Sequence, residues 1–223
     1  MQTRDLLVYT DKATDPVSNM KLESEIFEMV DEGEIPEAAR FWVNSACLVR
    51  GPARTAKHGW YNERLAEDMN IPVVTRSSGG GVVYQDEGNL NWSLFFRTTG
   101  SFLAPRTAFE LGSRHIIGAL ETLGVKPIFS PPNRIDVQGN KVSGMAARST
   151  PRALLVHGTL LLNTDLHRLN ALCIAPPDCP PVANLSDWVP GINRVKVEEA
   201  VIGELVRSGF NTTMVERPDP PRQ

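Results

Sequence analysis

The chain has 223 residues, of which 41% are hydrophobic and 22% are charged, and its net charge at pH 7 is −3. This length supports one domain with its own core, and the composition excludes a disordered, collagen-like or coiled-coil chain. The slightly acidic balance lacks the basic footprint of a nucleic-acid-binding protein, and no apolar run approaches the ~20 residues that span a bilayer.

Apolar periodicity predicts alternating strands and helices. The pattern predicts a strand at 6–9, a helix that begins at Ser18, strands at 41–43 and 46–49, a short helix at 62–70, and strands at 72–75, 82–84 and 91–96. It continues with a helix at 107–123, a hairpin turn at Gly139 and Asn140, a long strand at 153–162 and a helix at 197–206. We therefore expect an α+β fold with a mostly antiparallel sheet. One domain is expected over residues 1–212, followed by a disordered proline-rich tail over 213–223.

The cysteines, the histidines and the first residues bear on the compartment. Three cysteines without a CxxC pair and four histidines without ligand spacing show no zinc pattern, so we expect reduced thiols. No apolar segment typical of a signal peptide follows the first residues. We expect a cytoplasmic protein with neither a membrane nor a nucleic-acid partner.

A glycine-rich loop is the first segment that points to chemistry. It lies in RSSGGGVVYQDEGN, residues 76–89, between two predicted strands. Consecutive glycines let the backbone approach a ligand and present N–H groups to it, and Arg76 offers a fork of donors to a carboxylate or phosphate. A glycine-rich hairpin with a solvated arginine explains the same pattern. The spacing matches neither a Walker A loop nor a Rossmann fingerprint.

The second segment, NRIDVQGNKVSG at 133–144, places Lys141 directly after the predicted turn. Strand alternation is expected to put Lys141, Ser143 and Met145 on one face, and Val142 and Gly144 on the other. Lys141 is either an exposed hairpin lysine or a cation that neutralises a phosphate and an attacking carboxylate.

The third segment, HGTLLLNTDL at 157–166, contains a continuous apolar run that predicts a strand buried on both faces. We interpret His157 as a core histidine bonded to a backbone carbonyl rather than as a catalytic base. Asp165 is expected to cap the turn that follows the strand.

Together, in this order and spacing, the three segments resemble the lipoate–protein ligase A family, within the biotin/lipoate ligase superfamily. The resemblance implies a bent, mostly antiparallel sheet flanked by helices. It also implies that ATP, with Mg²⁺, activates lipoate as lipoyl-adenylate and releases pyrophosphate. A lysine of an acceptor, either a lipoyl domain or a protein like the glycine-cleavage H protein, then attacks the mixed anhydride to form an amide.

The resemblance also assigns roles to residues. Lys141 would bridge the lipoate carboxylate and the α-phosphate and stabilise the transition-state charge. Arg76 would orient the acyl or phosphate end, and Asp136 would lie near Mg²⁺ as a metal ligand. The other residues that the resemblance places at the ligand are Ser78, Gly79, Gly80, Gly81, Tyr84, Asp86, Asn89, Asn133, Ser143, Gly144, His157 and Thr159. The apolar tunnel for the acyl chain is expected from Trp42, Val82 and Val83.

The chain departs from the family pattern in side chains and in length. Gln85 replaces the usual histidine after the glycine loop, Thr75 replaces a frequent second arginine, and Val156 replaces the first histidine of the HHGTL stretch. Too few residues follow Asp165 for the accessory C-terminal domain that many members carry. We therefore expect a separate small accessory subunit.

Three other functions stay open. An ATP-independent octanoyl or lipoyl transferase would need a cysteine nucleophile, and Cys173 and Cys179 lie roughly where one branch of that class has its cysteine. Asp178, next to Cys179, disfavours a negatively charged thiolate. A lipoyl-binding scaffold without catalysis and a biotin ligase are weaker alternatives, because Lys141 is retained and the biotin-ligase glycine-arginine loop is missing.

Overall fold

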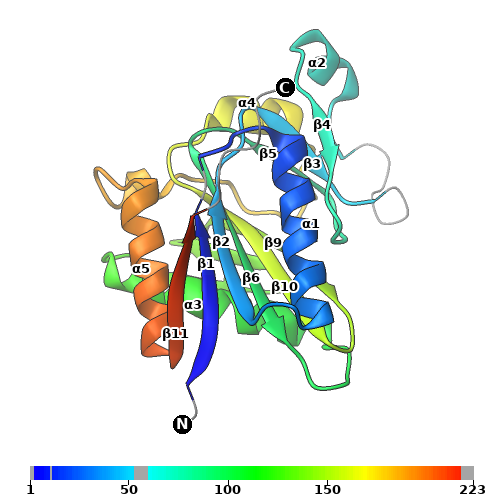
Figure 1. Ribbon diagram of the computed structural model, residues 1–223. Coiled ribbons are helices and arrows are strands. Elements are labelled where there is room, and N and C mark those ends of the chain that lie inside the picture. Colours follow the sequence, from blue (N-terminus) through cyan, green and yellow to red (C-terminus); the bar gives the residue numbers. More distant parts are fainter. Residues whose placement is uncertain (1–2, 11, 53–59, 217–223) are drawn as a thin grey trace.

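The computed structural model describes residues 3–10, 12–52 and 60–216. Its large sheet consists of β1 (Arg4–Thr10), β2 (Glu37–Trp42), β6 (Asn89–Arg97), β7 (Pro127–Ser130), β8 (Arg134–Val137), β9 (Asn140–Ser149), β10 (Ala153–Leu161) and β11 (Phe210–Glu216). These strands lie in the order β11-β1-β2-β6-β10-β9-β8-β7 (Figure 1). β1 pairs in parallel with β2 and β11, and the other neighbours in this sheet pair antiparallel.

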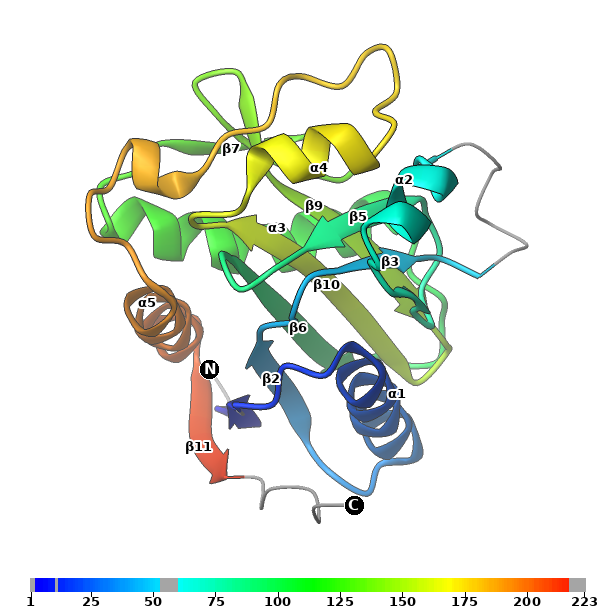
Figure 2. The ribbon, with the colours of Figure 1, turned by 90° about the horizontal axis from the view of Figure 1, so that it is seen from above.

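Helices cover both faces of the large sheet (Figure 2). Because neighbouring residues of a strand point to opposite faces, Phe95 of β6 packs with α1 (Pro16–Glu32), whereas Leu94 packs with α3 (Pro105–Thr122) and α5 (Arg194–Arg207). Two apolar cores result, one on each face. In the described ranges, no helix has both the length and the apolar character needed to cross a membrane.

A smaller sheet lies over one end of the large sheet. It consists of β4 (Val73–Thr75), β3 (Cys47–Arg50) and β5 (Val82–Gln85), in that order. The short helices α2 (Glu63–Asp68) and α4 (Leu166–Leu172) pack on it, and the 3-10 turn η1 (Leu185–Asp187) lies further along the chain. On its other side, Val49 packs with Met20 and Trp42, which ties the small sheet to α1 and β2.

This architecture confirms the expected α+β fold with a mostly antiparallel sheet, and it corrects two local predictions. Gln138 and Gly139 have positive φ angles of 49° and 82°, so they occupy the centre of the β8–β9 turn, one residue earlier than predicted. α1 begins before Ser18: Asp15 is its N-cap, and the Asp15 carboxylate accepts a hydrogen bond from the Ser18 N–H at 2.7 Å.

The C-terminal boundary was also predicted wrongly. The expected end of the domain at residue 212 falls inside β11, which pairs in parallel with β1 from Phe210 to Glu216. Residues 213–216 therefore belong to the sheet, because a distant strand supplies their hydrogen-bond partners. The rest of the predicted tail, 217–223, lies outside the described residues. The strand β7 and the helix α4 were likewise not predicted, whereas β8 is the strand that the predicted hairpin turn implies.

Candidate active site

A cavity of about 720 Å³ lies where the small sheet covers β9 and β10. Its apolar side includes Trp42, Val82 and Val83, the residues that were expected to form an acyl tunnel. Lys141 and His157 lie on the large-sheet side, and the proline-rich segment at 174–182 forms a further wall. The cavity therefore combines apolar walls with a few charged groups, as ligand sites commonly do.

Arg76 organises the glycine loop. Its Nη2 donates to the carbonyls of Gly79 at 2.8 Å and Gly81 at 3.0 Å, its Nη1 donates to the Val49 carbonyl at 3.1 Å, and its Nε donates to Ser78 Oγ at 3.1 Å. Burial lowers the pKa of Arg76 to about 10, so the guanidinium stays charged at neutral pH. Most of its donors are committed to the loop itself, and its first effect is to hold the loop's shape.

Two glycines of the loop are required by its geometry. Gly80 has a φ of 99°, which side-chain-bearing residues rarely adopt. A Cβ on Gly81 would lie 1.7 Å from Cζ3 of Trp60, so the indole occupies the space that a side chain would need. Trp60 lines the cavity. Trp60 was not among the predicted site residues, because it precedes Gly81 by about 20 residues in a segment without periodicity.

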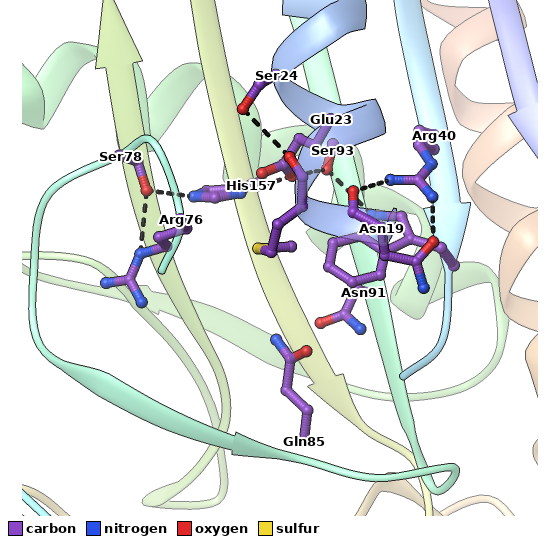
Figure 3. Close-up of polar contacts among 12 residues, drawn as sticks. Asn19, Glu23, Ser24, Arg40, Arg76, Ser78, Gln85, Asn91, Ser93 and His157 are labelled. Atoms are coloured by element: carbon purple, nitrogen blue, oxygen red, sulfur yellow. Dashed lines mark hydrogen bonds and ion pairs between the residues drawn. The ribbon is translucent and has the colours of Figure 1, made fainter. Parts of the chain in front are cut away.

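A buried polar chain connects the loop to α1 (Figure 3). His157 Nε2 lies 2.6 Å from Ser78 Oγ, His157 Nδ1 lies 2.7 Å from Glu23 Oε1, and Ser93 Oγ donates to Glu23 at 2.6 Å. His157 is therefore bonded to a carboxylate and a hydroxyl, and the expected bond to a backbone carbonyl is wrong. The physical reason is that α1 places an acid directly beneath β10.

Glu23 is ionised in this position. Burial alone raises the pKa of its carboxyl, but the charge and hydrogen bond of His157, the hydrogen bond from Ser93 and the charge of Arg40 outweigh it, and the pKa lies below its usual value. Glu23 was not among the predicted site residues either. Its helical spacing could have identified it, because Glu23 lies four residues after Asn19 and three before Ile26, on the buried face of the helix.

A second buried chain ends at Gln85, the residue that replaces the family's usual histidine. Arg40 Nη1 donates to the Asn19 carbonyl at 2.8 Å, Asn19 Nδ2 donates to Asn44 Oδ1 at 2.8 Å, and Asn44 Nδ2 donates to Gln85 Oε1 at 2.8 Å. Gln85 also lines the cavity. The Gln85 amide therefore links β5 to α1 through Asn44 and Asn19 and places a neutral polar group in the cavity wall.

Lys141 is positioned by a β-bulge that sequence alternation did not anticipate. Asp136 pairs with Lys141 but Ile135 pairs with Ser143, so β9 carries one extra residue at this point. The bulge changes which residues share a face: a Cβ on Gly144 would lie 3.1 Å from Cε of Lys141. The prediction that Lys141 shares a face with Ser143 and not with Gly144 is therefore wrong.

The proline-rich segment holds the backbone of Lys141. The Lys141 N–H donates to the Pro181 carbonyl at 2.8 Å, and the Ala183 N–H donates to the Lys141 carbonyl at 3.1 Å. In the described part of the chain no acidic oxygen lies within 4 Å of Nζ. Lys141 thus has a fixed backbone and an ammonium group available to an anion.

The structure brings most, though not all, of the predicted site residues to the cavity. Those that line it are Arg76, Gly80, Gly81, Tyr84, Asn133, Lys141, Gly144, His157 and Thr159. Those outside the cavity wall are Ser78, Gly79, Asp86, Asn89, Asp136 and Ser143.

The residues outside the wall have identifiable partners. Asp86 accepts hydrogen bonds from the N–H groups of Gly88 and Asp165, both at 2.9 Å, and so ties the β5–β6 turn to the start of α4. Asn89 Nδ2 donates to Asn91 Oδ1 at 3.1 Å. Asp165 caps α4 by accepting from the Arg168 N–H at 3.0 Å, as expected for a residue after the strand.

Asp136, the predicted Mg²⁺ ligand, lies outside the cavity wall. Its carboxylate forms an ion pair with Arg134, whose Nε and Nη2 each lie 3.4 Å from one of its oxygens. Among the described residues, no group of three or more histidine, cysteine, aspartate or glutamate side chains can hold a metal ion. Asp136 as a metal ligand therefore stays a prediction, and its ion pair with Arg134 competes with that role.

Positive charge predominates around the cavity. Among the described residues, the lysine and arginines that line it are Arg76, Arg134 and Lys141, and Asp178 is the acid in its wall. Cys173 and Cys179 also line it, but burial raises the pKa of the Cys173 thiol to about 11, so this thiol is protonated at neutral pH. Such a cavity suits an anion with an apolar tail.

Comparison with known proteins agrees with this picture. The fold is that of lipoate ligases of the biotin and lipoate ligase class: a putative lipoate protein ligase of Thermoplasma acidophilum, solved with bound lipoic acid, matches with a TM-score of 0.82 at 21% identity over 98% of this chain and 91% of its own. The model of the family described as the lipoyl protein ligase A/B catalytic domain matches residues 15–206. The chain belongs to this family.

Other relatives extend the comparison. Lipoate–protein ligase 1 of Staphylococcus aureus is 32% identical over 170 residues, which is 76% of this chain and 50% of that protein. The probable lipoate-protein ligase A of Mycoplasma genitalium is 30% identical over 76% of this chain and 48% of its own length. The chain spans about half the length of these curated relatives. A lipoate-protein ligase A solved with ATP has a TM-score of 0.83 at 20% identity over 98% of this chain and 90% of its own.

Proposed function

We propose that this chain activates lipoate with ATP and transfers the lipoyl group to a lysine of an acceptor protein. The observation that carries the proposal is the cavity: Lys141 has no anionic partner among the described residues and lies at one side of an apolar-walled pocket lined by further cations. A carboxylic acid with an apolar tail and a phosphate both suit these surroundings. The names of the relatives, and the lipoic acid and ATP bound to two structural neighbours, support the same proposal.

The first step brings two anions together. A lipoate carboxylate oxygen attacks the α-phosphorus of ATP, the bond to the β-phosphate breaks, and pyrophosphate leaves. The Lys141 ammonium neutralises the carboxylate and the α-phosphate, whose repulsion is the main barrier. Gly80 assists through its backbone: the Gly79 carbonyl faces Arg76, so the Gly80 N–H of the same planar peptide points away from the guanidinium. Mg²⁺ would enter on the nucleotide phosphates, which are hard oxygen ligands.

In the second step, an uncharged lysine amine of the acceptor attacks the acyl carbon, AMP leaves with the electron pair of the anhydride bond, and the nitrogen loses one proton to solvent as the amide forms. A lipoyl domain is the proposed acceptor. A bipartite lipoate protein ligase of Thermoplasma acidophilum, studied with its E2 lipoyl domain, matches this chain with a TM-score of 0.79 at 20% identity. By analogy, we propose a separately encoded accessory subunit for this chain.

Lipoate-dependent exchange between ATP and pyrophosphate tests the first step. We expect exchange with the purified chain and Mg²⁺, and its loss in Lys141→Ala. Lys126→Ala is the matched control, because Lys126 is exposed and lies outside the cavity wall. Exchange that survives in a folded Lys141→Ala variant would contradict the proposed role. If the purified chain shows no exchange, the assay is repeated with the proposed accessory subunit.

A cysteine-dependent acyl transferase is the second candidate, because Cys173 and Cys179 line the same cavity as Lys141. The protonated state of Cys173 at neutral pH disfavours it as a nucleophile. We expect the variant with both cysteines replaced by alanine to keep its exchange activity. Loss of acyl transfer from a carrier protein in this variant, with folding retained, would favour the transferase.

A further inference from the structure

We infer that Arg134 is a second anion-binding residue of this cavity, which holds the pyrophosphate half of ATP beside Lys141. The inference rests on the proposed function and adds a residue that neither the sequence motifs nor the resemblance assigned. It starts from the position of Arg134 in the cavity wall, on the strand that pairs with that of Lys141.

Strand pairing brings the two cations together. Arg134 of β8 is directly opposite Gly144 of β9. The Lys141 side chain lies over the same glycine: a Cβ on Gly144 would lie 3.1 Å from Cε and 3.2 Å from Nζ of Lys141. Gly144 has no side chain to separate the two, and the bulge after Lys141 turns the lysine toward this position. Two cations therefore lie next to each other at one side of the cavity.

The guanidinium is only partly satisfied by its acidic neighbour. Both contacts between Arg134 and Asp136 measure 3.4 Å, which is long for a charge-assisted hydrogen bond of about 2.8 Å. Arg134 Nε and Asp136 Oδ1 are both buried and have no hydrogen-bond partner among the described residues. Asp136 keeps the guanidinium in place electrostatically, and Nη1 of Arg134 has no hydrogen-bond or ion-pair partner in the described part of the chain, so it is the donor left for a further acceptor. About a quarter of the Arg134 side chain remains exposed.

The chemistry of the first step explains why a second cation is needed. When the carboxylate oxygen bonds to the α-phosphorus, the electron pair of the broken bond goes to the bridging oxygen of the leaving pyrophosphate, whose negative charge increases. Lys141 is occupied by the carboxylate and α-phosphate. A guanidinium is a planar fork that can bind two phosphate oxygens at once, so Arg134 suits the departing group.

Equilibrium binding by calorimetry tests the inference, with pyrophosphate, ATP and AMP as probes. We expect Arg134→Gln to weaken the binding of pyrophosphate and ATP by about tenfold or more, the loss of one charge-assisted contact, and to change that of AMP by less than about twofold. Arg134→Lys should retain part of the affinity, and Asp136→Asn should not weaken it. Arg148→Gln is the matched control, because Arg148 is also ion-paired, on β9, but lies outside the cavity wall.

Three outcomes would overturn the inference: an unchanged pyrophosphate affinity in Arg134→Gln, an equal loss for AMP and ATP, or the same loss in Asp136→Asn. If the unpaired Asp136 prevents Arg134→Gln from folding, the double variant with Asp136→Asn removes both charges and is compared with Asp136→Asn alone. A different result would contradict the proposed function and not this inference. If the wild-type chain binds pyrophosphate through Arg134 but shows no lipoate-dependent exchange, with or without the accessory subunit, the ligase proposal is wrong and the anion-binding site stands.

Discussion

A buried histidine away from the cavity should make this protein sensitive to mild acid. His115 on α3 is 1% exposed and contacts the rings of Phe96 and Phe210 at centroid distances of 6.1 and 6.0 Å. Burial and the positive charge of Arg114 lower its pKa from 6.5 to about 4. The unfolded chain therefore takes up a proton at a higher pH than the folded chain does.

The sign and size of the effect follow from these two pKa values. The contribution of neutral His115 to the free energy of unfolding is fully present above pH 6.5 and is lost as the pH falls from 6.5 toward 4. A difference of 2.5 pKa units corresponds to about 3 kcal/mol at the acid limit, of which about 2 kcal/mol is lost by pH 5. This is a large share of the free energy of unfolding of a typical domain.

Urea unfolding of the wild type and of His115→Gln between pH 7.5 and 5 measures the contribution of His115 to the free energy of unfolding. Glutamine does not titrate, so the difference in unfolding free energy between the two proteins should change by about 2 kcal/mol over this range, in the direction that favours the variant in acid. His167→Gln is the control, because His167 is exposed, and it should follow the wild type. Parallel pH profiles for the wild type and His115→Gln would refute the argument.

Two further predictions concern the cavity. Glu23→Ala should destabilise the protein by about 3–5 kcal/mol, because it leaves His157 without its buried partner, whereas Glu23→Gln should cost less; equal urea midpoints for Glu23→Ala and the wild type would contradict this. Gly81→Ala should push the Trp60 ring out of its place and raise the KM for lipoate in the exchange assay at least about tenfold; an unchanged KM would show that the ring does not border the acyl site.

Apolar patterns along the chain predicted those strands and helices whose buried residues can be recognised from their own sequence. The strand β10 has a continuous apolar run, and the helices α3 and α5 have apolar stripes, so the sequence of each indicates which residues are buried. β11 was missed, since its pairing with β1 joins residues about 200 positions apart. Trp60 was missed because no local pattern links it to Gly81, about 20 residues further on, and the two meet only after the chain has folded.

By itself, the sequence determined which chemical groups are available: a lysine after a tight turn, an arginine before three glycines, and a proline-rich segment of restricted conformation. Only the tertiary structure decided their geometry. The bulge in β9 places Lys141 over Gly144, and α1 sets Glu23 against His157. Arg134 of β8 forms an ion pair with Asp136 of the same strand. The physical reason is that side-chain periodicity is a local property of a strand or helix, whereas register shifts and ion pairs depend on which elements meet.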